Sequence, residues 1–410
     1  MKYGLIGERL GHSFSKMIHT KLGDYDYELR EIPKEELDGF MREGDFLGIN
    51  VTIPYKEAII PYLDEIDEEA RKIGAVNTVV NRGGRLYGYN TDFYGMKALF
   101  THAGVEARGK KAAILGTGGT SKTAAAVLES LGASEILRVS RGVRDGSITY
   151  GELYESHADT EIIVNTTPVG MYPNIDGCAV DVSQFPALSG VIDAVYNPIR
   201  TGLVMSAMEQ GIPAEGGLYM LVAQAIRASE IFLNKEYHPE TLNDIYDKIR
   251  REKESIVLIG MPASGKSTVG YMIAERLGRK FVDTDEMITD RIKIPIKDFF
   301  TLYGEEKFRG IESDVIRKLA GEASLVIATG GGAVLREENL SALKYNGKIY
   351  FIDRPLEKLI PTDTRPLASD KASIEARYNE RYALYCEGCD VHIDADVDAE
   401  SVADKILENF

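Results

Sequence analysis

The sequence predicts an α/β protein with mostly parallel sheets, divided into more than one domain. Short apolar runs alternate with amphipathic stretches along the whole chain, which is typical of buried parallel strands joined by helices. The chain has 410 residues, and at about 150 residues per domain this length corresponds to two or three domains. The hydrophobic fraction of 44% and the charged fraction of 27% are those of an ordinary globular protein, which argues against extensive disorder.

Charge and cysteine content narrow the class of protein. A formal net charge of −16 argues against a broad surface for nucleic acid or anionic membranes. The 3 cysteines exclude a disulfide scaffold and indicate a reducing compartment. The N-terminus lacks the pattern of a signal peptide, and no apolar stretch reaches membrane-spanning length. We therefore expect a cytoplasmic protein whose partners are small molecules, with no nucleic acid and no membrane; the oligomeric state stays open.

Buried strands are expected where short apolar runs are flanked by turn residues. The clearest runs are Ala112–Leu115, Glu161–Asn165, Val191–Ala194, Ile256–Ile259, Leu325–Ala328 and Lys348–Ile352. Helices are expected at Thr120–Ser130 and Lys266–Leu277. Helical spacing of apolar residues continues through Leu221–Arg250 and ends in the charged run Asp247–Glu254, which we interpret as a solvated helix end and a short linker. A new strand follows at once, so we place the main domain boundary near residue 253.

A dinucleotide site is indicated where the strand Lys111–Leu115 leads into the glycine-rich turn Gly116–Ser121 and a helix. Glycines let the backbone approach a pyrophosphate at the helix N-terminus, where free N–H groups favour an anion. The next strand ends in Ser140-Arg141-Gly142-Val143-Arg144, where an NAD site usually offers a carboxylate. Two guanidinium groups suit a 2′-phosphate, so we favour NADP(H) over an ordinary glycine turn with solvated arginines. The expected cofactor-binding residues here are Gly116, Thr117, Gly118, Gly119, Thr120, Ser140, Arg141 and Arg144.

Polar clusters lie upstream where helix or strand packing does not require them. They are Gly11–Ser15, Asn50–Lys56, Gly74–Thr78 and Gly88–Asp92. Taken singly, each can be explained by turn chemistry. Together and in this order they resemble the shikimate dehydrogenase family. The resemblance covers about residues 1–250 and continues through Asn165–Met171, Asp193–Pro198 and Gly217–Gln224.

This resemblance implies a substrate-binding domain of residues 1–95, completed by about 218–250, with a Rossmann NADP-binding domain of residues 96–217 between them. The implied reaction is the NADPH-dependent reduction of 3-dehydroshikimate to shikimate, with Lys56 and Asp92 as the catalytic proton-transfer pair. The other residues implied by the family are Ser13 and Ser15 for the substrate carboxylate, Thr52, Asn77, Asp92, Tyr196 and Gln224 around the ring, and Glu68, Ala194 and Gly217 at the cofactor. Two residues depart from the family pattern: Ser121 replaces a third glycine, and Tyr219 stands where a smaller residue is common near the nicotinamide.

A second nucleotide site is predicted downstream, where the strand Ile256–Ile259 runs into Gly260–Ser267, a complete G-x-x-x-x-G-K-S phosphate loop. Backbone N–H groups of such a loop surround phosphates, its lysine reaches the outer phosphate oxygens, and its serine coordinates Mg²⁺. The loop therefore predicts a nucleoside triphosphate, with Lys266 as a catalytic residue. The expected nucleotide-binding residues are Ala263, Ser264, Gly265, Lys266, Ser267 and Thr268.

Further motifs indicate what receives the phosphate. They are Asp283–Asp285, Gly304–Arg309, Gly330–Gly332, Thr364–Leu367 and Glu380–Tyr385. Singly, the acidic motif is compatible with a helix cap and Arg309 with a surface ion pair. Together with the phosphate loop they resemble the shikimate kinase family across about residues 254–410.

The kinase resemblance implies a P-loop domain with a parallel sheet that phosphorylates shikimate to shikimate 3-phosphate with ATP and Mg²⁺. Asp283 is then expected to support the metal with Ser267, and Asp285 to act as a catalytic residue that binds ring hydroxyls. Arg309 and Arg381 would hold the substrate carboxylate, with Gly331 lining the site and Arg365 covering ATP. The segment before Arg365 is short and lacks an additional arginine often found there.

We interpret the chain as a bifunctional enzyme of aromatic amino acid biosynthesis, because the product of one half is the substrate of the other. One alternative is a quinate/shikimate-type dehydrogenase with a weak kinase, and another is a catalytically inactive, metabolite-sensing regulator. Arg141 and Arg144 argue against the first alternative, and the retained reacting groups argue against the second. The Cys386/Cys389 spacing is attributed to coincidence, because no second cysteine pair accompanies it.

Overall fold

The computed structural model describes residues 1–10, 14–23, 25–142, 146–359 and 371–410. The chain divides into two compact units, Met1–Arg250 (unit 1) and Arg251–Phe410 (unit 2). The division falls inside helix α9 (Thr241–Lys253), close to the boundary expected near residue 253. Unit 2 includes the helix end because Arg251 Nε donates to the Phe410 carbonyl (2.8 Å) and Ser324 N donates to the Lys253 carbonyl (2.9 Å).

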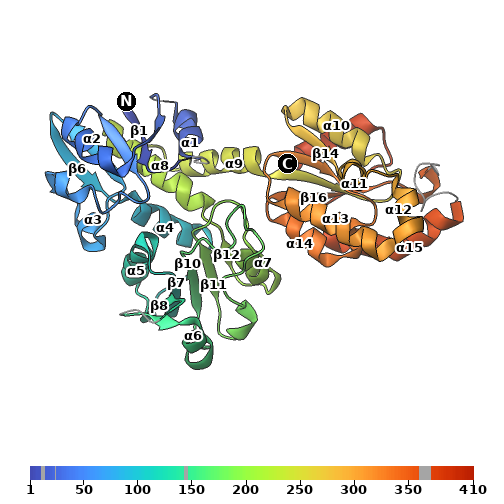
Figure 1. Ribbon diagram of the computed structural model, residues 1–410, viewed down its shortest axis with the longest axis horizontal. Helices are drawn as coiled ribbons and strands as arrows, with labels where there is room; N and C mark the ends of the chain where they lie inside the picture. The colour runs from blue at the N-terminus through green and yellow to red at the C-terminus, as the bar shows by residue number, and fades with distance from the viewer. Residues whose placement is uncertain (11–13, 24, 143–145, 360–370) are drawn as a thin grey trace. The chain divides into compact units, whose positions relative to one another are not determined.

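Unit 1 begins with a mixed sheet of strand order β2-β1-β3-β5-β6-β4 (Figure 1). Its strands are β1 (Tyr3–Gly7), β2 (Glu28–Glu31), β3 (Gly48–Val51), β4 (Glu65–Ile66), β5 (Thr78–Arg82) and β6 (Arg85–Tyr89), and its helices are α1 (Ser15–Leu22), α2 (Leu37–Glu43) and α3 (Glu68–Ile73). The β3–β5 and β5–β6 pairs are antiparallel, so this sheet departs from the parallel pattern expected for most of the chain. The β5–β6 pair is antiparallel because the two-residue turn at Gly83 and Gly84, with φ angles of 64° and 89°, closes a tight hairpin.

The second sheet of unit 1 is parallel, with strand order β12-β11-β10-β7-β8-β9. It comprises β7 (Lys111–Leu115), β8 (Glu135–Ser140), β9 (Ile148–Thr149), β10 (Ile162–Asn165), β11 (Gly190–Asp193) and β12 (Ala214–Glu215), with helices α5 (Gly119–Leu131), α6 (Tyr150–Ser156) and α7 (Gly202–Glu209). The chain leaves β7 toward β8 and later returns to its other side as β10. In sheets of this kind, ligands bind at the carboxyl ends of the strands beside such a reversal of order.

Two helices connect these sheets. Helix α4 (Thr91–His102) leads from the first sheet into the second, and α8 (Leu218–Leu233) follows the last strand of the second; Leu99 and Val222 from these helices belong to one buried core. The helical stretch expected over Leu221–Arg250 is two helices, α8 and α9. Asn234 ends α8 in a left-handed conformation (φ 50°), and Pro239, which lacks a backbone donor, lies before α9 begins.

Unit 2 is a parallel five-stranded sheet of order β14-β15-β13-β16-β17 with helices around it (Figure 1). Its strands are β13 (Ser255–Ile259), β14 (Lys280–Asp283), β15 (Leu325–Ala328), β16 (Gly347–Asp353) and β17 (Val391–Asp394). Its helices are α10 (Lys266–Leu277), α11 (Thr284–Ile292), α12 (Ile296–Tyr303), α13 (Glu305–Ala320), α14 (Glu337–Lys344), α15 (Lys371–Gly388) and α16 (Ala399–Glu408). Because parallel strands share one carboxyl edge, the phosphate loop, Asp283–Asp285 and Gly330–Gly332 meet there.

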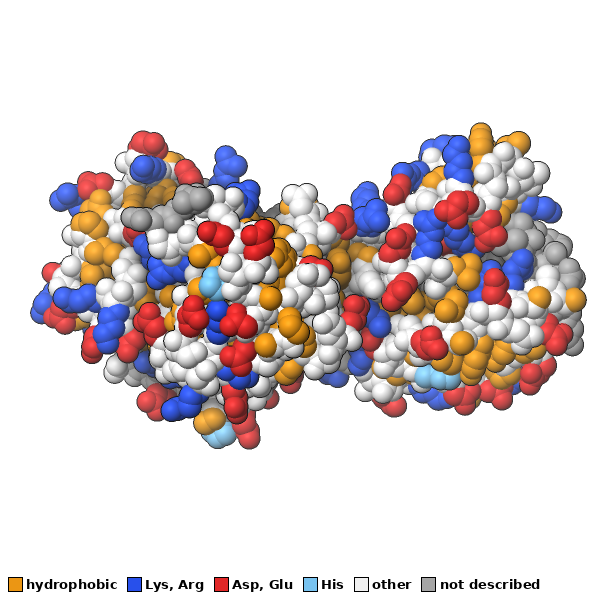
Figure 2. Space-filling view, turned by 90° about the horizontal axis from the view of Figure 1, so that it is seen from below, with side chains coloured by type: hydrophobic (Ala, Val, Ile, Leu, Met, Phe, Trp, Pro, Cys, Tyr) orange, Lys and Arg blue, Asp and Glu red, His pale blue; other side chains and the backbone are white. Residues whose placement is uncertain are grey.

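The surface charges are mixed. On the face in Figure 2, Lys and Arg side chains lie among Asp and Glu side chains rather than in one continuous area. Within the part of the chain that the structure describes, no helix is long and apolar enough to cross a membrane.

Candidate active sites

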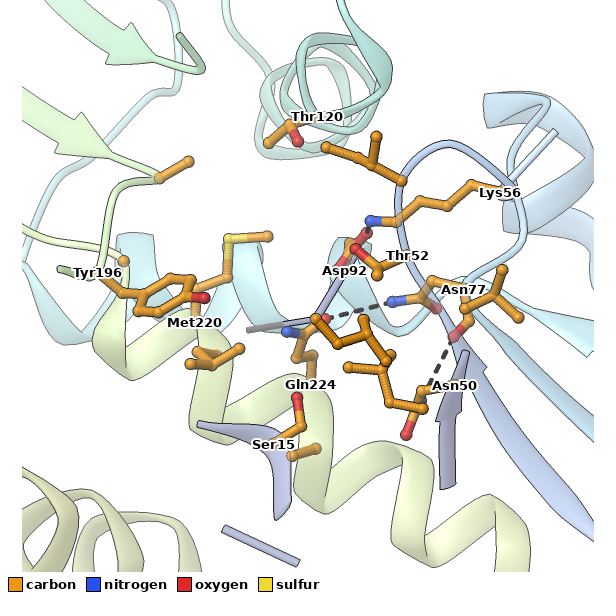
Figure 3. A pocket seen from close by; sticks show the side chains of 18 of the residues that line it. Ser15, Asn50, Thr52, Lys56, Asn77, Asp92, Thr120, Tyr196, Met220 and Gln224 are labelled. Atoms are coloured by element: carbon orange, nitrogen blue, oxygen red, sulfur yellow. Dashed lines mark hydrogen bonds and ion pairs between the residues drawn. The ribbon is translucent and has the colours of Figure 1, made fainter. Parts of the chain in front are cut away.

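A cavity of about 360 Å³ lies between the two sheets of unit 1. This volume is in the range of small-molecule sites. Its walls come from both sides: the loop after β3 and helix α4 face the N-terminal turn of α5 and the loop after β11 (Figure 3). The cavity brings together these residues expected from the sequence: Ser15, Thr52, Lys56, Asn77, Asp92, Thr120, Ala194, Tyr196, Gly217 and Gln224.

A lysine–carboxylate pair stands at this cavity. Lys56 Nζ lies 2.6 Å from Asp92 Oδ2, and the two side chains are 22% and 7% exposed (Figure 3). Asp92 is in the first turn of α4, whose N-terminus is capped by the Asn90 side chain accepting from Phe93 N. The Lys56 carbonyl accepts from Val76 N (2.8 Å), which fixes the loop that carries the lysine. An ammonium group and a carboxylate are thus held in contact beside a cavity large enough for a small-molecule ring.

Amide groups form the floor of the cavity. Asn77 Nδ2 donates to Gln224 Oε1 (3.3 Å), which joins the residue before β5 to helix α8 (Figure 3). Asn77 Oδ1 accepts from Thr91 N (2.7 Å), so the orientation of its amide is determined. Tyr196 lies across from this pair, and burial raises the pKa of its hydroxyl. Neutral donors and acceptors therefore lie beside the charged pair, and the exposed Arg9 also lines the cavity.

Sequence reasoning missed His19, Asn50 and Met220, which also line the cavity. His19 is buried, its ring stacks on Tyr27 at 3.8 Å, and burial lowers its pKa to about 3, although an Asn50 hydrogen bond acts in the opposite direction. The imidazole is therefore neutral at physiological pH. One signal was available: His19 follows Ser15 by one turn of α1, which places both on the same face.

Tyr219, the expected departure near the nicotinamide, turns away from this cavity. Its ring stacks on His102 at 3.8 Å, and its hydroxyl donates to Asn243 Oδ1 (2.9 Å) on α9. The preceding Gly217 does line the cavity, and a Cβ there would lie 2.3 Å from the Ala194 carbonyl. Only glycine fits at position 217, because of this close approach. The Tyr219 side chain instead packs against residues of α4 and α9.

The glycine turn after β7 fits a dinucleotide. Gly116 has a φ of 109°, and Gly118 and Gly119 leave open space where a Cβ would stand, at the N-terminus of α5. Ser121, in the place of a third glycine, is buried in α5 and leaves the open face of the turn unchanged. The free N–H groups of this helix end are the anion-binding feature that NADP(H) requires.

The other expected cofactor residues are dispersed. Arg141 is exposed directly after β8, and the Ser140 hydroxyl donates to the Gly142 carbonyl, which shapes this turn. Glu68 lies apart from the cavity lining, with its exposed carboxylate 2.6 Å from Lys72 Nζ. The expected site residues Ser13, Arg144 and Arg365 lie outside the described residues.

The phosphate loop of unit 2 has left-handed backbone at Ala263 (φ 65°) and Gly265 (φ 93°), directly before α10. Lys266 Nζ donates to the Gly260 and Met261 carbonyls at 2.9 and 2.8 Å, and the buried Ser264 hydroxyl has no partner among the described residues. Thr268 follows in α10. A ring of backbone N–H groups with an ammonium and an unpaired hydroxyl fits the phosphates of ATP.

A hydroxyl and a carboxylate beside the phosphate loop fit Mg²⁺. Ser267 Oγ donates to Asp283 Oδ2 (2.7 Å), and Asp283 Oδ1 accepts from Asp285 N (2.9 Å). These oxygen donors are of the kind that Mg²⁺ prefers, and the metal usually keeps waters and phosphate oxygens as its other ligands.

An arginine-rich acid site adjoins the loop. Arg309 is nearly buried and donates to Glu312 Oε2 (2.7 Å) and Glu305 Oε1 (2.8 Å). Arg381 Nη1 donates to the Gly331 carbonyl (3.2 Å). A Cβ at Gly330 would stand 2.6 Å from Asp285 Oδ1, and one at Gly332 would overlap the Arg309 guanidinium. The glycines thus let Asp285, Arg309 and Arg381 converge; we call this group of side chains the acid site.

The remaining cysteine pair forms no metal site with other ligands. Cys386 and Cys389 are free thiols, and the Cys389 Sγ donates to the Cys386 carbonyl. The described ranges contain no group of three or more His, Cys, Asp or Glu side chains that could hold a metal ion.

Known proteins resemble both units. The family model for the shikimate dehydrogenase substrate binding domain matches residues 5–79. The shikimate dehydrogenase (NADP(+)) of Clostridium perfringens is 38% identical over 266 residues, which cover 60% of this chain and 98% of that protein. This chain belongs to the shikimate dehydrogenase family. The family model for shikimate kinase matches residues 262–410.

Solved shikimate dehydrogenases share the fold of unit 1. Shikimate dehydrogenase 1 from Peptoclostridium difficile is 39% identical, with a TM-score of 0.56 over 61% of this chain and 98% of that one. The Thermus thermophilus enzyme in complex with NADP(H) and shikimate is 28% identical, with a TM-score of 0.55 over 60% and 99%. The chain is thus a bifunctional enzyme, an NADP-dependent shikimate dehydrogenase joined to an ATP-using shikimate kinase. Both expected resemblances are confirmed, and the alternatives of a quinate-type dehydrogenase and an inactive regulator are not favoured.

Proposed function

We propose that Lys56 and Asp92 transfer the proton when 3-dehydroshikimate is reduced, and that Asp285 and the acid site position shikimate for phosphorylation. The observation that carries the first role is the 2.6 Å contact between Lys56 Nζ and Asp92 Oδ2 beside the cavity. The second role is supported by the convergence of Asp285, Arg309 and Arg381 around Gly330–Gly332.

In unit 1, reduction of a ring ketone requires a proton on the carbonyl oxygen. The Lys56 ammonium lies at the cavity and donates that proton, while Asp92 orients it and takes part in the relay. Bound NADPH supplies the hydride for the carbonyl carbon. The Ser15 hydroxyl binds the substrate carboxylate, and Thr52, Asn77, Tyr196 and Gln224 surround the ring and its hydroxyls. Gly116–Thr120, Ala194 and Gly217 hold the cofactor.

In unit 2, the chain's residues act by positioning and by neutralising charge, as phosphoryl transfer requires. Arg309 and Arg381 hold the shikimate carboxylate, which places the 3-hydroxyl near Asp285. The Asp285 carboxylate accepts a hydrogen bond from that hydroxyl and orients its oxygen toward the phosphate loop. Lys266, which now donates to the Gly260 and Met261 carbonyls, would contact phosphate oxygens, and Ser267 with Asp283 would hold Mg²⁺, which would neutralise phosphate charge.

We further propose the domain division given by the sequence: 1–95 with 218–250 for the dehydrogenase substrate, 96–217 for NADP(H), and 254–410 for the kinase. The free thiols of Cys178, Cys386 and Cys389 support a reducing location, the cytoplasm.

The two activities of one chain serve as reciprocal controls. Lys56→Ala should lower dehydrogenase turnover by roughly 10²- to 10⁴-fold, the usual contribution of a positioned acid or base, and leave the kinase rate on supplied shikimate unchanged. Asp285→Asn should reduce kinase turnover and leave the dehydrogenase unchanged. Both rates are measured on each purified variant, from NADPH consumption and ADP formation.

These results would separate the two halves of the proposal. Near-normal reduction by Lys56→Ala would remove the lysine as proton donor. Phosphorylation of shikimate at the wild-type rate by Asp285→Asn would remove Asp285 from the reaction, whatever the dehydrogenase result.

A further inference from the structure

Helix α15 carries a second arginine one turn before Arg381. Arg377 and Arg381 are four residues apart, so they occupy neighbouring positions on one face of the helix. The Nη1 atom of Arg377 is buried and has no hydrogen-bond partner within the described ranges. A buried guanidinium N–H without an acceptor is unfavourable, because it has lost its water and nothing has replaced it.

The charged groups that act on Arg377 are two arginines of the acid site and two glutamates. Burial has the largest effect on the pKa of Arg377 and lowers it, and the charges of Arg381 and Arg309 lower it further. Glu305 and Glu380 act in the opposite direction. Its position one turn before Arg381 on α15, together with these effects, places Arg377 beside the arginines that are proposed to hold the shikimate carboxylate.

The carboxylates of this neighbourhood are engaged by the other two arginines. Glu305 Oε1 accepts from Arg309 Nη2 (2.8 Å), and Glu312 Oε2 accepts from Arg309 Nη1 (2.7 Å). Glu380 Oε2 accepts from Arg381 Nε (3.3 Å). Nη1 of Arg377 donates to none of them, and the buried Oε1 of Glu312 is likewise without a partner among the described residues. A bound anion would provide the acceptor that Nη1 lacks there.

We propose that Arg377 is a third guanidinium of the acid site and binds the substrate carboxylate together with Arg309 and Arg381. This rests on the proposed function, in which the other two arginines hold that carboxylate. A carboxylate offers about four lone-pair positions, which is enough for more than two guanidinium groups. Phosphate oxygens of the nucleotide have the same chemistry, but the charged groups that act on Arg377 do not include the phosphate-loop lysine; they are Arg381, Glu305, Glu380 and Arg309. The carboxylate is therefore the acceptor that the geometry favours.

Kinase kinetics of the full chain test this role. Arg377→Met keeps the apolar stem and removes the guanidinium, so the KM for shikimate should rise about 10- to 100-fold, the effect of one lost charge-assisted hydrogen bond. The kcat and the KM for ATP should stay near their wild-type values. The KM of Arg377→Lys for shikimate should lie between those of wild type and Arg377→Met, because lysine keeps the charge but lacks the planar guanidinium. Arg291→Met is the matched control, since Arg291 Nη2 pairs with Asp314 Oδ2 (2.8 Å) and both side chains are half exposed.

A substrate analogue identifies the group that Arg377 contacts. With shikimate carboxamide, which lacks the negative charge, Arg377→Met and wild type should have nearly the same KM. An equal increase with acid and amide would overturn the proposal and indicate a structural role. An increase in the KM for ATP instead would overturn it in favour of a phosphate contact.

The same kinetics distinguish failure of the proposed function from failure of the role of Arg377. A wild-type chain that does not phosphorylate shikimate contradicts the proposed function itself. A wild type that does so, with Arg377→Met matching Arg291→Met in its KM for shikimate, overturns only the role of Arg377. Retained ATP binding by each variant confirms that unit 2 is folded.

Discussion

Asp193 should make the stability of unit 1 depend on pH in a direction opposite to that of most carboxylates. It ends β11, is completely buried, and accepts hydrogen bonds from Thr201 Oγ1 (2.6 Å), Val195 N (2.9 Å) and Asn165 Nδ2 (3.0 Å). Burial raises the pKa of Asp193 from 3.8 to about 6, although these hydrogen bonds act in the opposite direction. The loop that it holds carries Tyr196 of the cavity.

The sign and size of the effect follow from this difference in pKa. Between pH 3.8 and about 6 the native state binds the proton that the unfolded state has released, so its stability falls as the pH rises through this window. At about 1.36 kcal/mol per pH unit, a difference of roughly two units corresponds to about 3 kcal/mol lost above pH 6. The loss is complete at neutral pH, where Asp193 is ionised in both states.

Asp193→Asn tests this reasoning, because asparagine resembles the protonated acid. Its Oδ1 can accept from Val195 N and Asn165, and its amide can donate to Thr201 Oγ1, a hydroxyl with two acceptor positions. The free energy of unfolding of unit 1 should therefore rise by up to about 3 kcal/mol at pH 7.5 and change little at pH 4. Urea titration with hydrogen exchange of β10 and β11 peptides measures unit 1 apart from unit 2.

A matched control has the opposite sign. Asp181 is exposed, and hydrogen bonds from Ser183 lower the pKa of its carboxyl, so its stabilisation is present above its unfolded pKa and is lost in acid. Asp181→Asn should therefore slightly destabilise unit 1 at pH 7.5. If Asp193→Asn is less stable than wild type at pH 7.5, or if its effect is the same at both pH values, then Asp193 is not held at a raised pKa.

Other parts of the chain give further expectations. Arg141→Ala should lower the ratio of kcat/KM for NADPH to kcat/KM for NADH at least tenfold, because a charge-assisted contact is lost. Arg138→Ala is the control: this side chain is exposed on β8, and its loss should leave the ratio unchanged. Ser267→Ala should raise the Mg²⁺ concentration for half-maximal kinase activity at least tenfold, with an unchanged dehydrogenase rate. Fragments 1–250 and 251–410 should each fold and keep their own activity. Thermal unfolding should show that 251–410 is more stable than 254–410, because the shorter fragment lacks the Arg251–Phe410 and Lys253–Ser324 hydrogen bonds. An inactive 1–250 or 251–410 fragment would show that the two units depend on each other.

Local motifs explain why much of the fold could be predicted from the sequence. The central strands of both parallel sheets are continuous apolar runs, and α10 has the bounds that its glycine-rich start and amphipathic spacing predict. The interruption of the predicted Leu221–Arg250 helix was not recognised, because apolar spacing continues on both sides of Asn234 and Pro239. Short edge strands such as β9 and β12 have two residues each, too few to show any period.

The residues that the structure brings together in the candidate sites could be expected from the sequence where they lie within short motifs, and not where tertiary packing selects a neighbour. Lys56, Asp92, Lys266 and Asp283 belong to such motifs. His19 and Met220 reach the cavity only because α1 packs against α8 and β1, and α8 against α4 and β5; their residue types are those of an ordinary core. Tyr219 shows the converse. It lies two residues after Gly217, a residue expected at the cofactor, yet its ring stacks on His102 and its hydroxyl donates to Asn243 of α9.

The proposed assignments imply that one acid is recognised by different chemistry in the two units. In unit 1 the cavity offers mainly hydroxyls and amides, with the exposed Arg9 at its edge, and the proposed proton donor Lys56 is already paired with Asp92. Unit 2 must place the same carboxylate close to the negative phosphates of a nucleotide, so neutral donors would leave like charges in proximity. Guanidinium groups remove that repulsion. The buried Glu312 and the exposed Glu305 both pair with Arg309, which orients its guanidinium before the substrate arrives. The same requirement would account for the proposed third arginine, Arg377. Its Nη1 has no acceptor among the described residues, which is unfavourable in the empty site and is relieved when the acid binds.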